Sequence, residues 1–149
     1  MKEVIILFGE MGGGKNYHGE ILAKEKGYTF LDGDTVAQPE MLERVSQFKS
    51  LTREMIKKFI GRLIAAISLK AFKSNGLVVA QALYFDEDRI FIKWFLNQLG
   101  YNVKFIWVKP SFLRNLMQIY SRPKGLTWAV YWLLNKPWFQ KPTHDYEKI

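Results

Sequence analysis

Cysteine is absent from this chain of 149 residues, and histidine occurs only twice. The first absence excludes disulfides, thiolate metal sites and cysteine nucleophiles, and the second argues against a histidine-based zinc site. Long apolar runs are also missing: Val4 to Phe8 is too short for the core of a signal peptide, and no stretch reaches transmembrane length. We therefore expect a cytoplasmic protein, although a secreted protein without a cleavable signal would have the same features.

Acidic residues are also fewer than basic residues. The chain carries 22 lysine and arginine residues against 14 aspartate and glutamate residues, which gives a net charge of +8. This excess predicts an anionic partner, which could be a nucleotide, a phosphorylated metabolite, a nucleic acid or an acidic membrane. Apolar residues make up 48% of the chain, enough for the core of one globular domain over residues 1–149.

A glycine-rich motif follows the first apolar run, which is typical of a buried strand. Its glycines and its lysine have the spacing of the first seven positions of the Walker A pattern, in which backbone N–H groups wrap a polyphosphate. Glycines allow φ > 0 there, and the next helix directs its positive N-terminus at the anion. We expect Lys15 to act on the β and γ phosphates. The expected nucleotide-binding residues are Gly9, Glu10, Met11, Gly12, Gly13, Gly14, Lys15 and Asn16.

Asn16 departs from this pattern, which places a serine or threonine hydroxyl on Mg²⁺ at the eighth position. An amide oxygen can approach the metal directly or through water, so Asn16 stays a candidate metal ligand of a different kind.

Two carboxylates, Asp32 and Asp34, follow a short strand predicted over residues 28–31 and are separated by a glycine. In an open parallel sheet, ligands bind at the carboxyl ends of the strands, so both carboxylates should face the same crevice as the glycine-rich loop. Alternatively, one or both cap the turn that follows.

Apolar periodicity and capping residues predict alternating strands and helices. Thr52 and Asp86 are expected as N-caps of two of the helices. Expected helices cover residues 17–26, 39–48, 53–72, 86–99 and 111–122, and expected strands cover 4–8, 28–31, 77–82, 103–108 and a short part of 143–149. Expected inward side chains of the helices at 17–26 and 86–99 are Ile21, Leu22, Ile90, Phe91, Trp94 and Phe95.

Two polar positions are candidates for substrate contacts. Gln81 interrupts the apolar strand at 77–82, and because a buried amide without partners costs about 1–3 kcal/mol, it either bonds within the fold or faces the site. Arg62 lies with Lys57 and Lys58 on the exposed side of the helix at 53–72, where these residues are either solvated or hold an anionic acceptor.

Arginines and aromatic residues are grouped near the C-terminus. Arg114 and Arg122 are eight residues apart, about two helical turns, and can share a face, although they could also be surface charges. Residues 125–139 mix tryptophan, tyrosine and phenylalanine with lysine, which is consistent with a lid, an interfacial membrane helix or a partner surface. We expect a lid-like segment over about residues 111–141.

Because these features occur in this order along the sequence, the whole chain resembles the small P-loop kinases that include shikimate, gluconate and adenylylsulfate kinases. The resemblance lies in Phe8 to Lys15, in Leu31 to Asp34, in the strand Val78 to Leu83, and in Arg114 and Arg122 ahead of a lid. It implies an α/β fold of three layers, with a parallel sheet in the order 2-3-1-4-5, helices on both faces and a helical lid. Departures are Asn16, the lack of a Walker B carboxylate, and a chain that stops where the fifth strand and the adenine-binding loop are expected.

The resemblance also implies roles. It implies transfer of the γ-phosphoryl group of ATP to a hydroxyl of a small-molecule acceptor, with Mg²⁺ bridging the phosphates. Asp34 is then the candidate general base and Asp32 the candidate for metal or acceptor binding. Arg122 is the first candidate, and Arg114 the second, for a position beside the transferred phosphate or the adenine.

Other functions stay open at this point. Asn16 and the missing Walker B acid are also compatible with a protein that binds nucleotide without turnover. The positive charge and the aromatic side chains are compatible with a nucleic-acid 5′-end kinase or a nucleic-acid-binding protein, which we favour less. A membrane-surface role for residues 127–139 is a further alternative.

Overall fold

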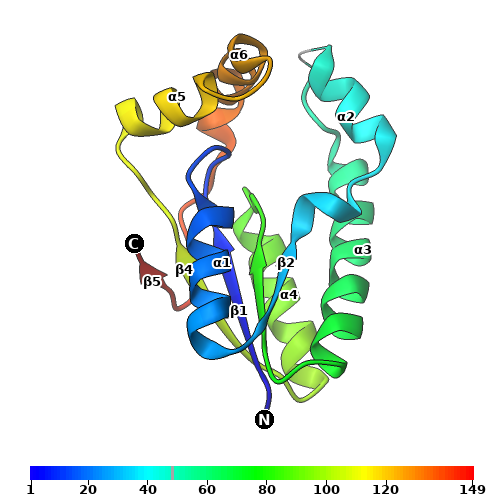
Figure 1. Cartoon of the computed structure of the whole chain (residues 1–149). Coiled ribbons are helices and arrows are strands. Elements are labelled where there is room, and N and C mark those ends of the chain that lie inside the picture. Colours follow the sequence, from blue (N-terminus) through cyan, green and yellow to red (C-terminus); the bar gives the residue numbers. More distant parts are fainter. Residues whose placement is uncertain (48) are drawn as a thin grey trace.

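The computed structural model describes residues 1–47 and 49–149, and its centre is a sheet of five parallel strands (Figure 1). The strands are β1 (Glu3–Phe8), β2 (Thr29–Asp32), β3 (Leu77–Ala80), β4 (Asn102–Trp107) and β5 (Glu147–Lys148). Their order is β2-β3-β1-β4-β5, which confirms the expected order. The fifth strand is confirmed too, but it is shorter than the segment 143–149 within which it was expected.

β1 is the central strand of the sheet. It pairs in parallel with β3 on one side and with β4 on the other, and its residues Val4 to Phe8 are all buried. A parallel strand covered on both faces needs side chains that are apolar in both directions, which explains the unbroken apolar run. The strand therefore delivers the glycine-rich loop to the middle of the sheet edge.

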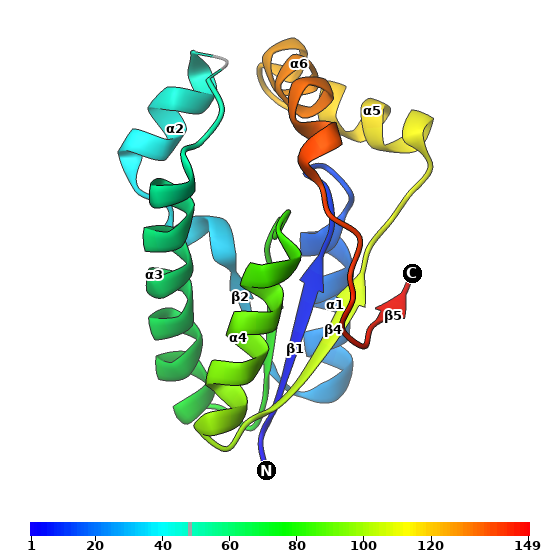
Figure 2. The same ribbon diagram turned by 180° about the vertical axis from the view of Figure 1, so that it is seen from behind.

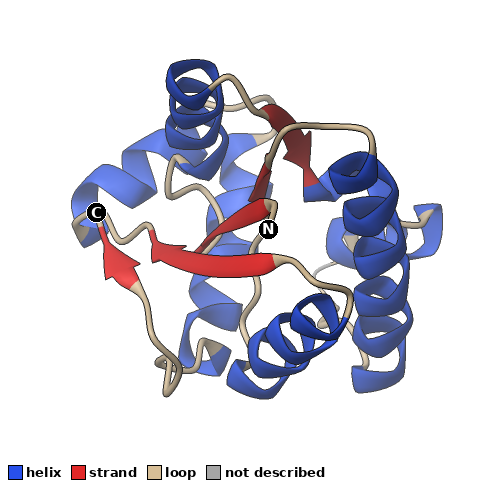
Figure 3. Ribbon diagram, turned by 90° about the horizontal axis from the view of Figure 1, so that it is seen from below, coloured by secondary structure: helices blue, strands red, loops and turns tan. Residues whose placement is uncertain are grey.

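Helices cover both faces of the sheet. They are α1 (Lys15–Lys26), α2 (Pro39–Ser46), α3 (Arg53–Phe72), α4 (Asp86–Gln98), α5 (Phe112–Tyr120) and α6 (Gly125–Asn135), with short 3-10 turns η1 (Gly33–Val36) and η2 (Lys136–Trp138). α1 lies in front of the sheet in Figure 1, and α4 lies in front of it in the view from behind (Figure 2). The view along the strands shows the resulting three layers (Figure 3).

Above the carboxyl ends of the strands, α2 stands on one side and α5 and α6 on the other (Figure 1). α3 has the predicted bounds, and Thr52 caps it by accepting a hydrogen bond from the Met55 N–H at 3.1 Å. The expected helix at 39–48 ends at Ser46, and Phe48 lies outside the described residues. Within the described residues, no helix is both long enough and apolar enough to span a membrane.

The predicted inward face of α4 is wrong for three of its four residues, whereas Phe95 packs against the core as expected. Phe91 and Trp94 are about half exposed, and Ile90 is 44% exposed, whereas Asp88 and Arg89 are buried. The helix is rotated because Arg89 has its partners inside the protein: its guanidinium donates to the carbonyl oxygen of Leu83 at 2.6 Å and lies over two aromatic rings. In α1, Ile21 is likewise exposed, since the small Gly19 and Ala23 face the sheet instead.

Asp86 is not an N-cap, because the cap position belongs to Phe85. The carboxylate instead accepts hydrogen bonds from the Thr143 N–H at 3.0 Å and from the Thr143 hydroxyl, and it lies 3.4 Å from the Arg89 guanidinium. These contacts fasten the C-terminal segment to the start of α4. The predicted capping role failed because the partners come from a segment that is distant in the sequence.

We expect Asp86→Ala to lower the free energy of unfolding by roughly 2–4 kcal/mol, because it leaves the buried Arg89 cation without its carboxylate and frees residues 140–149. Urea denaturation at pH 7 measures this change. Asp145→Ala, which removes an exposed carboxylate from the same segment, is the control and should stay within about 0.5 kcal/mol of the unmodified chain. Equal stabilities of the two variants would contradict the role given to Asp86.

Candidate functional site

A cavity of about 1070 Å³ opens at the carboxyl ends of the strands. The glycine-rich loop and the start of α1 form one end, α2 and α3 form one wall, and residues of α6 and η2 form the other. Residues from the end of β3 to Phe85 form the floor. The predicted site residues that line it are Met11, Gly12, Gly14, Lys15, Asn16, Asp34, Gln81 and Arg122.

Lys15 is the buried cation of this site. Its side chain is only 9% exposed, and its Nζ donates a hydrogen bond to the carbonyl oxygen of Glu10 at 2.8 Å. Burial lowers the pKa of Lys15 to about 8, with a further contribution from the positive charge of Arg122, while Asp34 and Asp32 oppose this shift. The loop therefore keeps the Lys15 ammonium group away from solvent and bound to the loop backbone. This group lies at the position where an anion would bind.

The glycines of the loop are required by its conformation. Gly12 and Gly14 have φ values of 74° and 85°, in the left-handed region. A Cβ atom at Gly12 would also lie 2.1 Å from the side chain of Ile119 in α5. The backbone of the loop therefore packs directly against this side chain. The loop conformation is consequently coupled to the position of α5.

Side chains from distant segments hold the loop in place. Lys136 donates to both carboxylate oxygens of Glu10, at 3.0 and 3.1 Å. The Met11 N–H donates to the Tyr84 hydroxyl at 3.3 Å, and the Asn115 amide donates to the Met11 carbonyl oxygen at 3.2 Å. Sequence reasoning missed all three contacts, because polar pairs far apart in the chain leave no periodic signal.

Asp32 and Asp34 have different environments. Asp32 caps η1 by accepting a hydrogen bond from the Asp34 N–H at 3.0 Å, and its second oxygen accepts one from the Asn16 amide at 3.1 Å. The alternative capping role of Asp32 is therefore observed, whereas Asp34 lines the cavity. Burial within the cavity walls and the neighbouring Asp32 raise the pKa of Asp34, and Lys15 partly opposes this.

Asn16 and Asp32 lie together beside the loop, and both side chains have oxygen atoms that could act as metal ligands. Their 3.1 Å contact brings an amide and a carboxylate together at the start of α1. Among the described residues, no three histidine, aspartate or glutamate side chains gather into a metal cluster. One carboxylate and one amide match the requirements of Mg²⁺, which is usually held by one or two protein oxygens and by substrate phosphates.

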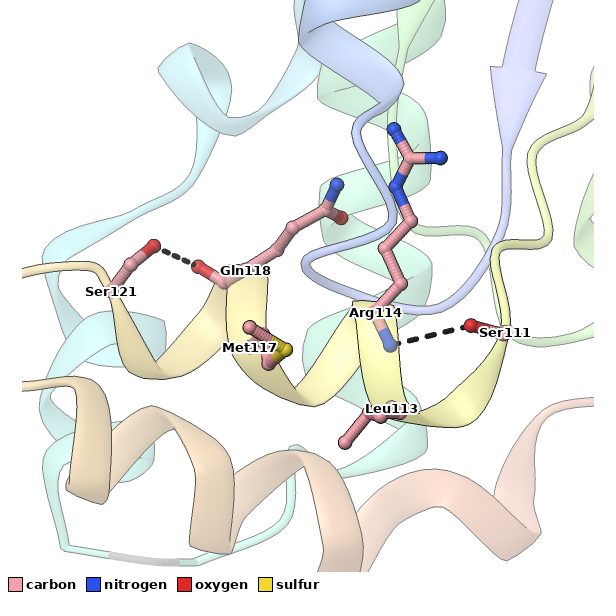
Figure 4. Close-up of a pocket in the computed structure, with 6 residues that line it drawn as sticks. All are labelled: Ser111, Leu113, Arg114, Met117, Gln118 and Ser121. Carbon is pink, nitrogen blue, oxygen red and sulfur yellow. Dashed lines mark hydrogen bonds between the residues drawn. The ribbon is translucent and has the colours of Figure 1, made fainter.

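The three arginines that the sequence offered as site residues lie in different places in the structure. Arg122 lines the cavity and is close enough to Lys15 and Asp34 for its charge to act on both. Arg62 does not line it: its side chain is bound to the Val36 carbonyl oxygen at 3.1 Å. Arg114 lies outside it as well, in a hollow of about 400 Å³ along α5, and in Figure 4 its side chain extends to the same side of the helix as that of Gln118.

Gln81 is 92% buried at the floor of the cavity, in the position that follows β3. Its Oε1 atom has no hydrogen-bond partner among the described residues, and it lies where a Cβ atom at Gly33 would be, which explains the glycine between the two aspartates. Gln81 therefore lines the cavity while its Oε1 atom is turned toward Gly33, and β3 carries no carboxylate.

Comparisons with known proteins identify this architecture. No protein-family model matches the sequence, and no curated protein sequence matches it. Solved structures do match over the whole chain. A gluconokinase from Sinorhizobium meliloti has a TM-score of 0.78 at 17% identity, with 99% of this chain and 80% of that chain covered. A sugar kinase from a Janibacter species has a TM-score of 0.83 at 16% identity, with 100% and 84% covered.

An APS kinase from Mycobacterium tuberculosis, in complex with AMPPNP and APS, has a TM-score of 0.67 at 17% identity, with 99% of this chain and 87% of that chain covered. This chain has the fold of the small P-loop kinases. The glycine-rich loop that follows β1 occupies the position of the phosphate loop in this fold, and the cavity lies beside it. The fold confirms the expected architecture, and the roles of individual residues stay proposals.

We predict that inorganic triphosphate binds this P-loop fold more weakly as the pH rises through 8. Lys15 is fully charged below its lowered pKa of about 8, and a bound polyanion raises that pKa, so affinity is highest below pH 8. Above it, affinity should fall by up to about tenfold per pH unit. Calorimetric titration between pH 7 and pH 9.5 measures this loss.

Lys15→Arg is the control for that titration, because a guanidinium stays charged across this range and any titration of the ligand itself affects both proteins. The ratio of the two affinities should change with pH. A constant ratio would contradict the lowered pKa of Lys15.

Proposed function

We propose that this chain is an ATP-dependent phosphotransferase that moves the γ-phosphoryl group of ATP to a hydroxyl of a small-molecule acceptor. The observation that carries the proposal is the convergence of Lys15, Asp34 and Arg122 at the phosphate-loop end of one cavity. The kinases with which the chain shares its fold, one of them solved with AMPPNP, support it.

The phosphate loop supplies the binding of the triphosphate in this proposal. Phosphoryl transfer requires mainly positioning and stabilisation of charge, which backbone N–H groups and a lysine provide. Lys15 leaves its contact with the Glu10 carbonyl oxygen and donates to the β and γ phosphates, which raises its pKa and keeps it charged above pH 8. Arg122 meets the charge that develops on the transferred group.

Asp34 acts as the base in the same step. The acceptor oxygen forms a bond to the γ phosphorus while the bond from that phosphorus to the β–γ bridging oxygen breaks, and ADP leaves. The hydroxyl proton passes to the Asp34 carboxylate, whose raised pKa makes it a better proton acceptor than an ordinary aspartate. Gln81, on the cavity floor, orients the acceptor beside it.

We assign Asn16 and Asp32 to Mg²⁺ in this proposal. Mg²⁺ supplies neutralisation of the phosphate oxygens and a fixed geometry for the triphosphate when bound. Asn16 contributes its amide oxygen, and Asp32 keeps η1 capped with one carboxylate oxygen while the other is directed to Asn16. The chain from α5 to η2 acts as the lid. Its residues Trp128, Tyr131 and Trp138 line the cavity from that side and exclude water.

We expect acceptor-dependent release of ADP from Mg-ATP when the protein is supplied with pooled sugars and sugar acids, alcohols, nucleosides and 5′-hydroxyl oligonucleotides. Lys15→Ala should lower the rate at least about 100-fold through lost charge stabilisation. Asp34→Asn should lower it about 10²- to 10⁴-fold through the lost base. Matched controls are Lys24→Ala on the exposed side of α1 and Asp145→Asn, which should keep the full rate. Equal rates in the site variants and their controls would contradict the proposal.

A second candidate, nucleotide binding without turnover, is favoured by two observations. The Asn16 amide donates a hydrogen bond to Asp32, and β3 carries no acidic residue that could act as the Walker B carboxylate. We expect Asn16→Ser to change the rate by less than about tenfold if the native chain is a working kinase. Turnover that appears only in Asn16→Ser would favour this second candidate, and Asn16→Ala is the control for loss of the side chain.

A further inference from the structure

We infer that the acceptor half of the cavity binds an uncharged alcohol with a large apolar body, aliphatic or aromatic, and not a polyol or an anion. The inference rests on the proposed phosphotransferase function and deepens it. It concerns the part of the cavity between α2 and α3 on one side and α6 and η2 on the other.

The wall that begins immediately after Asp34 is apolar. Aliphatic and aromatic side chains from α2 and α3 line it, namely Met41, Leu42, Val45, Ile56, Phe59 and Ile60. The facing wall carries the aromatic rings of Trp128, Tyr131 and Trp138. Apolar surface that stays in contact with water is unfavourable, so a ligand that covers both walls is stabilised in proportion to the apolar area it buries.

The charged side chains of the cavity are distributed unequally. Lys15, Asp34 and Arg122 lie at the phosphate-loop end, and the acceptor half contains one ion pair among the described residues. In that pair, Arg53 donates to both carboxylate oxygens of Asp88 at 2.8 Å, and it also contacts Glu87.

The Arg53 guanidinium is also stacked 4.2 Å from the centroid of the Phe85 ring. A bidentate pair with a second carboxylate beside it neutralises the positive charge of Arg53, so Arg53 offers little attraction to an anionic acceptor. The two carboxylates outnumber the one cation, which disfavours an acceptor that carries negative charge.

Ser50 and Asn135 are neutral polar residues on the same walls, and their side chains are bonded to each other. The Ser50 hydroxyl contacts the Asn135 side-chain oxygen at 3.3 Å, and the Asn135 amide donates to the Tyr131 carbonyl oxygen at 2.8 Å. A sugar bound here would leave most of its hydroxyls without partners, which is costly in a water-excluding site. One hydroxyl group of the acceptor has a partner, because the Asp34 carboxylate lines the cavity at the end of the apolar wall.

Two readouts test the inference. Calorimetric titration without nucleotide measures binding of n-butanol, n-hexanol, n-octanol, 2-phenylethanol, glycerol and gluconate, and ADP release from Mg-ATP measures their use as acceptors. We expect affinity to rise about three- to fourfold per added methylene along the n-alkanols, from the transfer free energy of about 0.8 kcal/mol per CH₂. Glycerol and gluconate should bind more weakly than n-octanol in titration and release less ADP.

A matched pair of variants places the effect in the cavity. Leu42 and Leu69 have nearly equal exposures, 56% and 58%, but only Leu42 lines the cavity. Leu42→Ser should lower the affinity for n-octanol roughly three- to tenfold, and Leu69→Ser should leave it unchanged. Equal effects of the two substitutions would overturn the assignment of the apolar wall.

The outcomes separate the inference from the function on which it rests. ADP release stimulated by long-chain or aromatic alcohols supports both. Stimulation by gluconate or glycerol alone keeps the kinase and overturns the apolar acceptor. Binding that depends on chain length without any ADP release supports the apolar pocket and contradicts the phosphotransferase. Absence of chain-length dependence in both readouts overturns the inference.

Discussion

A buried guanidinium is the contact on which the geometry of the site depends. Arg89 is fully buried, donates to the carbonyl oxygens of Leu83 and Gln140, and lies over the ring of Phe8 at 4.6 Å. Burial of a cation is costly unless hydrogen bonds and a carboxylate compensate it, so these segments are held in one arrangement. They are the end of β1, which leads into the glycine-rich loop, the floor of the cavity, where Tyr84 contacts that loop, and the chain that follows η2.

That arrangement divides one cavity into two regions with different chemistry. At the phosphate-loop end, desolvation lowers the pKa of Lys15 and raises that of Asp34, which prepares a cation for an anion and a carboxylate for a proton. In the other half, Arg53 is paired with Asp88 and Glu87, and apolar walls surround these side chains. In the proposed phosphotransferase, this division favours transfer to a bound alcohol over transfer to water, because apolar walls disfavour bound water.

Much of the fold could be predicted from the sequence, because strong periodicity and local capping encode it. The bounds and inward face of α3 follow from apolar spacing, and Thr52 caps it by local geometry. The rotation of α4 could not be predicted, since its charged Arg89 faces inward and its Trp94 outward, against the usual preferences. The glycine-rich loop and Asp34 were predicted from their motif and both line the cavity, whereas the Lys136–Glu10 contact joins residues 126 positions apart and leaves no local signal.

Direct observation of the transferred group tests the central claim most sharply. ATP labelled in its γ-phosphoryl group is incubated with Mg²⁺, the protein and a mixture of sugars and apolar alcohols, and the label is followed into products. The account predicts label in an organic phosphate ester, with at least about a 100-fold lower yield for Asp34→Asn. Label that stays in ATP, or that appears only in inorganic phosphate, would contradict it.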